Sequence, residues 1–452
     1  MVGTKAKSQR MTMESFNQQK IGMFEKIAYG MSNMGGNICN TAIASFITLY
    51  YTDSVGIAAA TVGTMLLIAR IFDAISDIVM GAIIDKSNTK WGQARPWFIL
   101  SILPFALSTI LVFAVPDGMN EVGQTIYMYV TYIFTGVICY TVNSLSAISM
   151  QSLMTGDTKE RMGLNASYQI FGFISIIAVN MITINLVDKL GWKGMAVLYA
   201  LISMIILFIT GLVCKERRYQ VETTEEIGKE VNVTFRQGFP VLLRNKYFYI
   251  ILILSISNYI TINTFNAGGV YYAVYILGNG NLFGLMTIAG MLPTILLTTA
   301  VPYVGNKLGK RNTLILGYFL QAVGFVIVYL AGTSLPLMIA GLVIKGIGLA
   351  PIASLLIPMI GDVIEYEERC SGLRLAGLLN SAATFGIKAG SGLGAAMVGW
   401  LLAWGGYVAS AAVQSASTVL AMKLMVAGIP IMCSVIGIVL SFVFDIEKKV
   451  NR

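Results

Sequence analysis

Three ionisable residues lie near the middle of an apolar stretch at residues 61–84. Arg70, Asp73 and Asp77 are three and four residues apart, and this spacing places their side chains along one face of a helix. The stretch is long enough to cross a bilayer, where charged groups are costly and face a protein interior or a wet cavity. Two carboxylates one turn apart, with a cation beside them, are typical of a coupling site for Na⁺ or H⁺.

Two lysines are expected at a similar depth in other spans. Lys345 and Lys388 lie about ten and fifteen residues into their apolar stretches, too far from the ends to reach the interface easily. With Arg70, they give three positive groups against the two carboxylates. This excess of positive charge favours an anionic substrate, unless one lysine is neutral.

The composition is that of a polytopic membrane protein. Of 452 residues, 56% are hydrophobic and 12% are charged, about half the charged fraction of a soluble protein. The net charge of +9 is explained by basic loops on the cytoplasmic side, so no nucleic-acid partner is expected. There is no histidine and the five cysteines are scattered, so we expect no cofactor and no disulfide framework.

Apolar stretches of about 20 residues predict about twelve membrane-spanning helices. Lysine and arginine alternate between the loops, which predicts that both termini and the middle loop are cytoplasmic in a plasma or bacterial inner membrane. The predicted spans are 27–51, 61–84, 96–115, 125–150, 164–187, 194–214, 247–276, 281–304, 312–331, 335–361, 373–404 and 423–445.

The one long polar segment, 215–246, divides the chain into two predicted six-helix halves. Each half has a basic, glycine-containing turn after its second span, which indicates a duplicated transporter with its site between the halves. The predicted parts are a cytoplasmic N-terminal segment 1–24, a first half 25–214, the middle loop 215–246, a second half 247–446 and a cytoplasmic tail 447–452.

Uncharged polar side chains gather in the first, fourth, fifth and seventh spans. Amides and hydroxyls facing a cavity would suit a polyhydroxylated ligand such as a sugar. The alternative is hydrogen bonding between helices, worth about 1 kcal/mol per bond. The candidate substrate-binding residues are Asn37, Asn143, Ser144, Gln169, Asn263, Lys345 and Lys388.

Several motifs resemble those of one transporter family. The segments ARIFDAISD at 69–77 and DKSNTKWGQARPW at 85–97 are similar to the glycoside–pentoside–hexuronide:cation symporters, the melibiose permease-like family. YYTDSVG at 50–56, TGDTKER at 155–161 and the segment 361–394 are also similar. The resemblance extends over essentially the whole chain. It implies an all-α membrane protein of the major facilitator superfamily, with twelve helices in two six-helix halves.

The resemblance also implies residue roles. Asp73 and Asp77 match the cation-binding carboxylates, which would be metal ligands if the ion is Na⁺. Ser76 and Thr141 match positions that supply further oxygen ligands, and Lys388 matches a lysine near both sites. Arg70 and Arg161 are assigned to a charge network.

This chain departs from the family at other positions. Asn37 and Ser144 stand where family aspartates hold the sugar, and Gln169 stands in place of an arginine. Ser76 replaces an asparagine of the cation site, which leaves Na⁺ and H⁺ both open. The cation machinery is therefore retained, whereas the identity of the sugar does not follow from the resemblance.

The sequence thus predicts a Na⁺- or H⁺-coupled symporter that imports a glycoside, pentoside or hexuronide by alternating access. It is expected to work as a monomer surrounded by membrane lipid, with a small molecule as its substrate. A carrier of lysophospholipids or other anionic substrates on the same fold is one alternative. A non-transporting sugar sensor is another, but the middle loop is too short to be a soluble domain. No nucleophile–base constellation or Walker motif is present, so an enzyme is not expected.

Overall fold

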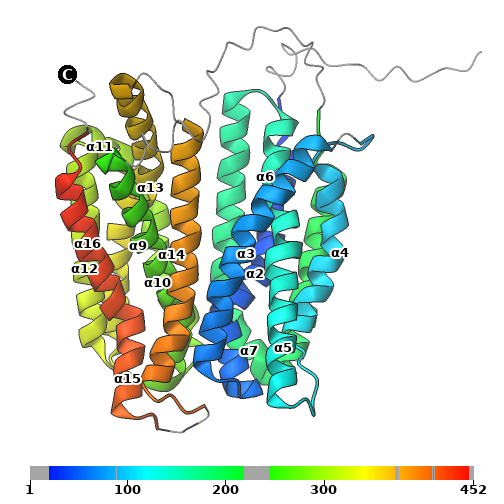
Figure 1. Cartoon of the computed structure of the whole chain (residues 1–452), viewed down its shortest axis with the longest axis vertical. Coiled ribbons are helices and arrows are strands. Elements are labelled where there is room, and N and C mark those ends of the chain that lie inside the picture. Colours follow the sequence, from blue (N-terminus) through cyan, green and yellow to red (C-terminus); the bar gives the residue numbers. More distant parts are fainter. Residues whose placement is uncertain are drawn as a thin grey trace, which may run out of the picture.

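A computed structural model of the chain describes residues 20–87, 89–217, 244–371, 376–409, 411 and 413–446. This described part is built from helices, and its one β feature is an isolated bridge between Thr89 and Gly92. Figure 1 shows the helices running roughly side by side. The predicted segments 1–24, 215–246 and 447–452 lie wholly or largely outside the described residues, and the predicted domain boundaries stay predictions.

The first half of the chain forms a bundle of long helices. It contains two π-helical segments, labelled η, whose wider turns interrupt the α-helical register. The elements are α2 (Met23–Leu49), η1 (Tyr50–Val55), α3 (Ala59–Lys86), α4 (Arg95–Val112), α5 (Glu121–Tyr132), η2 (Ile133–Cys139), α6 (Tyr140–Met154) and α7 (Thr158–Val213).

The second half forms another bundle of the same kind. Its elements are α9 (Lys246–Tyr271), η3 (Tyr272–Ile276), α10 (Leu282–Thr298), α11 (Val301–Leu308), α12 (Lys310–Ala331), α13 (Leu335–Ser371), α14 (Ala376–Trp404), α15 (Ala416–Lys423), η4 (Leu424–Gly428) and α16 (Ile429–Val443).

The number of membrane spans was predicted as about twelve. In the described part, eight helices are long and apolar enough to cross a membrane, or nine if α10 and α11, bent by 64°, form one span. That count takes α7 once, although Gly191 has a non-helical φ of 69° and divides it into two helices. It also leaves out α2 and α3, which are 27 and 28 residues long. The total of twelve therefore stays a prediction.

The first helices of the two halves end in the same way. Both η1 and η3 begin at or beside a pair of tyrosines, Tyr50–Tyr51 and Tyr271–Tyr272. Each segment is followed by a glycine with positive φ, 88° at Gly56 and 70° at Gly278, a conformation that glycine adopts without strain. This repeated ending supports the duplication that the basic turns indicated.

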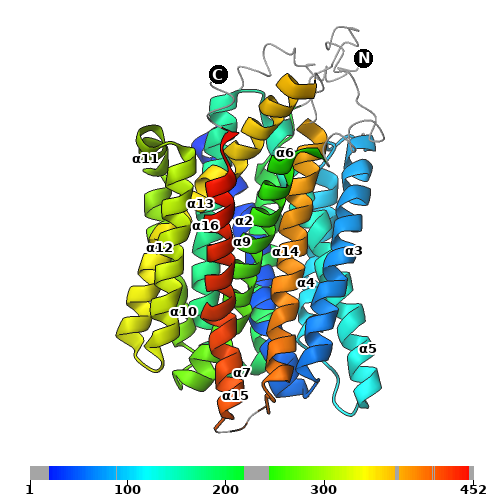
Figure 2. The ribbon, with the colours of Figure 1, turned by 60° about the vertical axis from the view of Figure 1, so that its left-hand side comes forward.

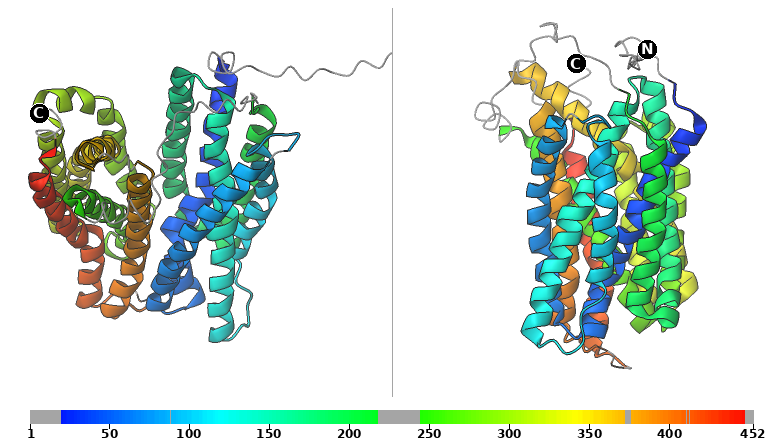
Figure 3. Two further views of the ribbon diagram at one scale, coloured as in Figure 1. Left: turned by 45° about the horizontal axis from the view of Figure 1, so that its top comes forward. Right: turned by 90° about the vertical axis from the view of Figure 1, so that its right-hand side faces the viewer.

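The two halves lie next to each other (Figures 1 and 2). They meet where α3 packs on α14, α2 on α9, and α7 on α10. The start of α2 and the end of α16 lie on the same side of the bundle, which we call the termini end (Figure 3). The opposite side is called the far end.

Glycines let α3 and α14 approach closely toward the far end. A Cβ atom on Gly63 would lie 2.7 Å from the carbonyl oxygen of Ala396, and one on Gly399 would collide with the Ala59 carbonyl. Nearer the middle, a Cβ on Gly392 would lie 3.0 Å from the Cβ of Arg70. Small residues at these positions bring the two backbones into contact, as in other membrane helix pairs. This contact sets the position of the ionisable residues of α3 against α14.

Candidate functional site

The charged residues of α3 meet a lysine from the other half of the molecule. The Arg70 Nη1 atom lies 3.5 Å from Asp73 Oδ2. Lys388 of α14 lies with its Nζ atom 3.4 Å from the same oxygen and also pairs with Asp77. The side chain of Thr141, on α6, donates a 3.0 Å hydrogen bond to Asp73 Oδ1. We call these five residues the carboxylate cluster.

The carboxylate cluster is electrically balanced. Two carboxylates, Asp73 and Asp77, face two cations, Arg70 and Lys388. Lys388 also donates a 2.9 Å hydrogen bond to the backbone carbonyl of Asp73. A cation that binds both carboxylates therefore has to compete with the Lys388 ammonium, which already occupies the space between them.

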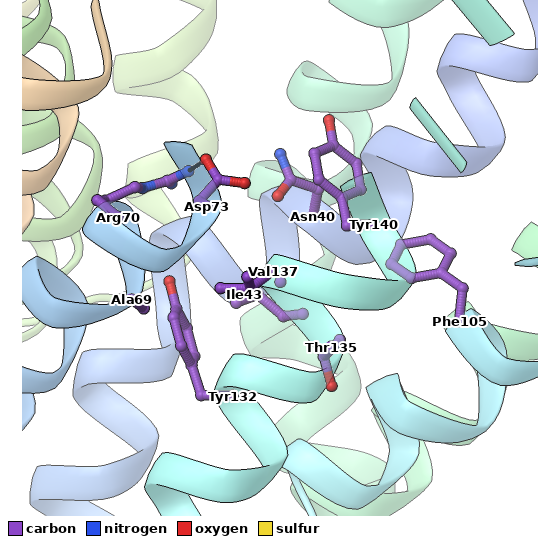
Figure 4. Close-up of a pocket in the computed structure, with 11 residues that line it drawn as sticks. Asn40, Ile43, Ala69, Arg70, Asp73, Phe105, Tyr132, Thr135, Val137 and Tyr140 are labelled. Atoms are coloured by element: carbon purple, nitrogen blue, oxygen red, sulfur yellow. Dashed lines mark ion pairs between the residues drawn. The ribbon is translucent and has the colours of Figure 1, made fainter. Parts of the chain in front are cut away.

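A small cavity is lined by Arg70 and Asp73 of the carboxylate cluster, but not by Lys388 (Figure 4). Its volume is about 20 Å³, enough for about one water molecule or one ion without its hydration shell. Figure 4 shows Arg70 and Tyr132 on one side of the Asp73 carboxylate and Asn40 and Tyr140 on the other. Asn40 and the tyrosines were not among the predicted site residues, because a single asparagine or tyrosine in a span is common in helix packing.

The predicted cation ligands converge only in part. Asp73 and Thr141 are directly bonded, and Asp77 is joined to them through Lys388. Ser76 instead donates its hydroxyl hydrogen to the backbone carbonyl of Val137 at 2.7 Å. Val137 belongs to η2, where a π-helical turn leaves carbonyl groups out of the regular α-helical pattern.

A larger cavity of about 530 Å³ lies mainly within the second half, with one wall from α7 of the first half. This volume is within the usual range for binding sites of small molecules. Its polar lining residues are Gln169, Ser255, Asn258, Tyr259, Asn266, Thr287, Thr294 and Lys345. The apolar ones are Phe173, Ile176, Ile262, Phe265, Met291, Ile295, Leu349, Ile352, Ala353, Leu356, Ile360, Ala383 and Ile387.

Lys345 lies at this larger cavity and not at the carboxylate cluster. Its Nζ atom is 4.7 Å from the ring centre of Phe265 and 5.8 Å from that of Phe325. The charge balance predicted from the sequence set Lys345, Lys388 and Arg70 together against the two carboxylates, but the structure separates Lys345 from the other two. Depth along a helix fixes how far a residue lies from the membrane surface, but not which side of the bundle it faces.

Of the predicted substrate-binding residues, Gln169 and Lys345 line the larger cavity. Asn263, although on the same helix as Asn258 and Asn266, donates to the backbone carbonyl of Tyr259 at 2.9 Å. Lys388 belongs to the carboxylate cluster. In the seventh span, the neighbouring Asn258 and Asn266 line the cavity instead.

The other three predicted residues lie in the first half, within contacts of its own helices. Asn37 donates to Asn33 Oδ1 at 2.8 Å, and Ser144 bonds the Thr141 carbonyl of its own helix at 3.4 Å. Asn143 is buried and donates to Ser101 Oγ at 3.0 Å, joining α6 to α4. Asn143 thus fits the alternative of hydrogen bonding between helices, whereas the bonds of Asn37 and Ser144 stay within their own helices.

Arg161 is not part of the carboxylate cluster. Its guanidinium donates to the backbone carbonyl of Thr155 at 2.8 Å and to that of Ser152 at 3.3 Å. These carbonyls lie at the end of α6, where a helix leaves its last carbonyls unpaired and favours a cation. Arg161 therefore caps the C-terminal end of α6. The structure does not join it to Arg70 in one charge network, as was predicted.

The far end of the bundle is held together across the two halves. Asp53 of η1 accepts hydrogen bonds of 2.5 Å from Tyr275 of η3 and from Tyr407, which follows α14. Nearby, the hydroxyls of Thr52 and Tyr271 lie 2.8 Å apart. Sequence reasoning missed this group because an aspartate at the end of a span is usual in a solvated loop. Its position in YYTDSVG was the available signal.

The termini end differs from the far end. Its ion pairs join residues of the same half, and this is seen in both halves of the described part. The pairs are Arg217–Glu25, Lys26–Glu160, Lys246–Asp445 and Lys310–Asp362. The structure thus combines bonds between the halves at the far end with bonds inside each half at the termini end.

A bundle of this shape is found in solved transporters. The crystal structure of a D-xylose-proton symporter superposes with a TM-score of 0.65 at 12% identity, covering 92% of this chain and 97% of the other. This likeness shows the fold: a bundle of apolar helices arranged as in that symporter. The family described as MFS/sugar transport protein matches residues 28–448, and the chain belongs to this family.

Two relatives show the range of this group. An isoprimeverose transporter of Lactiplantibacillus pentosus is 29% identical over 95% of this chain and 89% of its own length. A glucuronide carrier protein homolog of Escherichia coli (strain K12) is 25% identical over 94% of this chain and 92% of its own length. The chain is therefore a member of a family of sugar transporters whose named substrates include both neutral and acidic sugars.

Proposed function

We propose that this protein is a cation-coupled sugar symporter. The observation that carries the proposal is the position of Lys388, which belongs to the second half and binds the two carboxylates of the first half. Any cation that binds Asp73 and Asp77 competes with a charge contact between the halves. Cation binding and the arrangement of the halves are then linked in free energy.

Na⁺ and H⁺ act on this contact in the same direction. Na⁺ adds one positive charge to a balanced cluster, and protonation of either carboxylate removes one negative charge. In both cases Lys388 loses part of its attraction to Asp73 and Asp77. Thr141, already bonded to Asp73, would supply a further oxygen to a bound Na⁺, whereas Ser76 would first have to leave the Val137 carbonyl.

The asymmetry of the two ends fits alternating access. Asp53 and its tyrosine partners join the two halves at the far end, and the basic loops of the sequence predict that the termini end is cytoplasmic. In this reading the structure is the state closed to the outside, with the larger cavity as the sugar site. Return to the other state breaks the Asp53 bonds, and the protein completes the cycle as a monomer within the lipid bilayer.

The apolar wall of the larger cavity favours a second candidate, a carrier of anionic amphiphiles such as lysophospholipids. Thirteen of its lining residues are apolar. Of its eight polar lining residues, Thr287 and Thr294 donate to backbone carbonyls. The other six are still more than a single charged headgroup requires, and they fit the many hydroxyls of a sugar better.

The proposal is tested by sugar uptake into vesicles that contain the purified protein. Each sugar is offered with a Na⁺, Li⁺ or pH gradient alone. We expect accumulation of at least one glycoside with one of these gradients. Uptake that equilibrates but never accumulates with any gradient would contradict coupling, and would leave a facilitated carrier.

A further inference from the structure

Lys345 lies deep inside the second half. Only 7% of its surface is exposed, and its ammonium is in contact with the faces of two phenylalanine rings, Phe265 and Phe325. On its other side it approaches Gly290 of α10, where a Cβ atom would lie 3.3 Å from the Lys345 Nζ atom. The ammonium thus lies between α9, α10, α12 and α13, at the edge of the larger cavity.

Within the described residues, Lys345 has no acidic partner. Both carboxylates of the membrane interior are bound by Lys388 and Arg70. The aromatic faces stabilise a desolvated ammonium by about 2 kcal/mol, less than the several kcal/mol that burial of a charge costs. A buried cation in this setting is stabilised further by an anion that enters the cavity.

A second polar group of the same cavity also lacks a partner. The side-chain oxygen Oδ1 of Asn258 is buried and accepts no hydrogen bond from the described part of the chain, and Asn258 as a whole is 8% exposed. Buried polar groups are nearly always hydrogen-bonded, so an unpaired one needs an explanation. Because the residue lines the cavity, a rotation of its amide would bring this acceptor to a hydroxyl donor on a ligand. Lys345 and Asn258 line one cavity from two different helices, α13 and α9.

The apolar side of the cavity indicates a further part of the ligand. Leu349, Ile352 and Leu356 follow one another along α13 on the cavity side, which gives an apolar strip. Such a strip stabilises an apolar group by about 25 cal/mol for each Å² removed from water. A ligand that uses all three features has an acid group, hydroxyls and an apolar part.

We propose that the larger cavity selects an acidic glycoside. Lys345 binds the sugar carboxylate, a sugar hydroxyl donates a hydrogen bond to Asn258, and the aglycone packs against α13. Lys345 is then the residue that distinguishes an acidic sugar from its neutral counterpart. This inference rests on the proposed function, because it names the substrate class of that transporter.

The test compares two ligands with the same aglycone, p-nitrophenyl β-D-glucuronide and p-nitrophenyl β-D-glucoside. Their dissociation constants are measured by calorimetry on the purified protein. We expect the wild type to bind the glucuronide about 10- to 100-fold more tightly, as for a hydrogen bond to a charged group. Lys345→Met should reduce this preference to about threefold or less, and Lys345→Arg should keep most of it.

Two controls accompany these variants. Lys193→Met removes a positive charge from an exposed lysine outside the cavity and should leave the preference unchanged. Thermal unfolding of each variant shows whether it is folded. Lys345→Met should bind the glucoside only slightly less tightly than the wild type does, because methionine fills about the same space as lysine.

Three results would overturn the proposal: equal binding of the two glycosides by the wild type, an unchanged preference in Lys345→Met, or no binding of the glucuronide. Displacement of the glucuronide by micromolar lysophosphatidylglycerol would also overturn it, in favour of an anionic lipid. Failure of the proposed cation coupling gives a different result. The protein would still prefer the glucuronide, but its uptake would not depend on any cation gradient.

Discussion

Lys388 and Lys345 lie on neighbouring helices of the second half, the first half-buried and the second buried, yet their surroundings are opposite. Lys388 has two carboxylates within reach of its ammonium, whereas Lys345 has two aromatic rings. The first belongs to a balanced set of charges that spans both halves. The second is a single positive charge beside a cavity. Coupling to a cation and choice of the substrate's charge can therefore be changed separately.

The largest effect is expected from Asp77→Asn. The variant removes the carboxylate that pairs with Lys388 alone, so the cluster keeps one negative charge against two positive ones. A cation is then repelled, and we expect cation-driven accumulation to fall by at least about 100-fold. Uptake into vesicles with each gradient measures this, with thermal unfolding as the check on folding. Accumulation at the wild-type level would exclude Asp77 from the cation site.

Lys388→Met should have a smaller effect in the opposite sense on cation binding. Without the ammonium, Asp77 loses its cation and Asp73 keeps only Arg70, so a coupling cation binds without displacing Lys388. We expect about tenfold tighter binding of the coupling cation, which corresponds to about 1.4 kcal/mol. The shift of the unfolding temperature with cation concentration measures this affinity. Accumulation should be lost, because cation binding no longer changes the contact between the halves.

Lys345→Met should leave the cation affinity within about twofold of the wild type. Lys345 contacts none of the residues of the carboxylate cluster, and sites without shared partners usually behave additively. The same unfolding titration is used, with Lys388→Met as the reference for a real change. A tenfold shift in Lys345→Met would mean that the two lysines belong to one electrostatic unit, as the sequence analysis had assumed.

Contacts between residues close together in the chain could be predicted from the sequence. Arg70, Asp73 and Asp77 lie on one helix, so their spacing alone placed them together, and the structure has Arg70 and Asp73 in contact. The contact between Asp73 and Lys388 joins residues 315 positions apart. Periodicity has no information on such a pair, and only the family resemblance pointed to it.

The polar residues were harder to assign for a physical reason. Asn37, Asn143 and Asn258 look alike in sequence, since each is an amide in an apolar span. Whether such a group binds a ligand or a neighbouring helix depends on what faces it after packing. Asn143 meets Ser101, whereas the Asn258 oxygen meets no hydrogen-bond donor among the described residues. That difference exists only in the folded bundle.

The glycine contact between α3 and α14 has a mechanical consequence. Lys388 is 11 residues from Gly399, and the start of α14 is 23 residues from it, or about 16 Å and 35 Å along the helix. If the backbone contact at Gly399 is the fulcrum, α14 is a lever that about doubles any movement at Lys388. A movement of Lys388 away from the carboxylates by a few tenths of an ångström would then move the start of α14, at the termini end, by about twice as much.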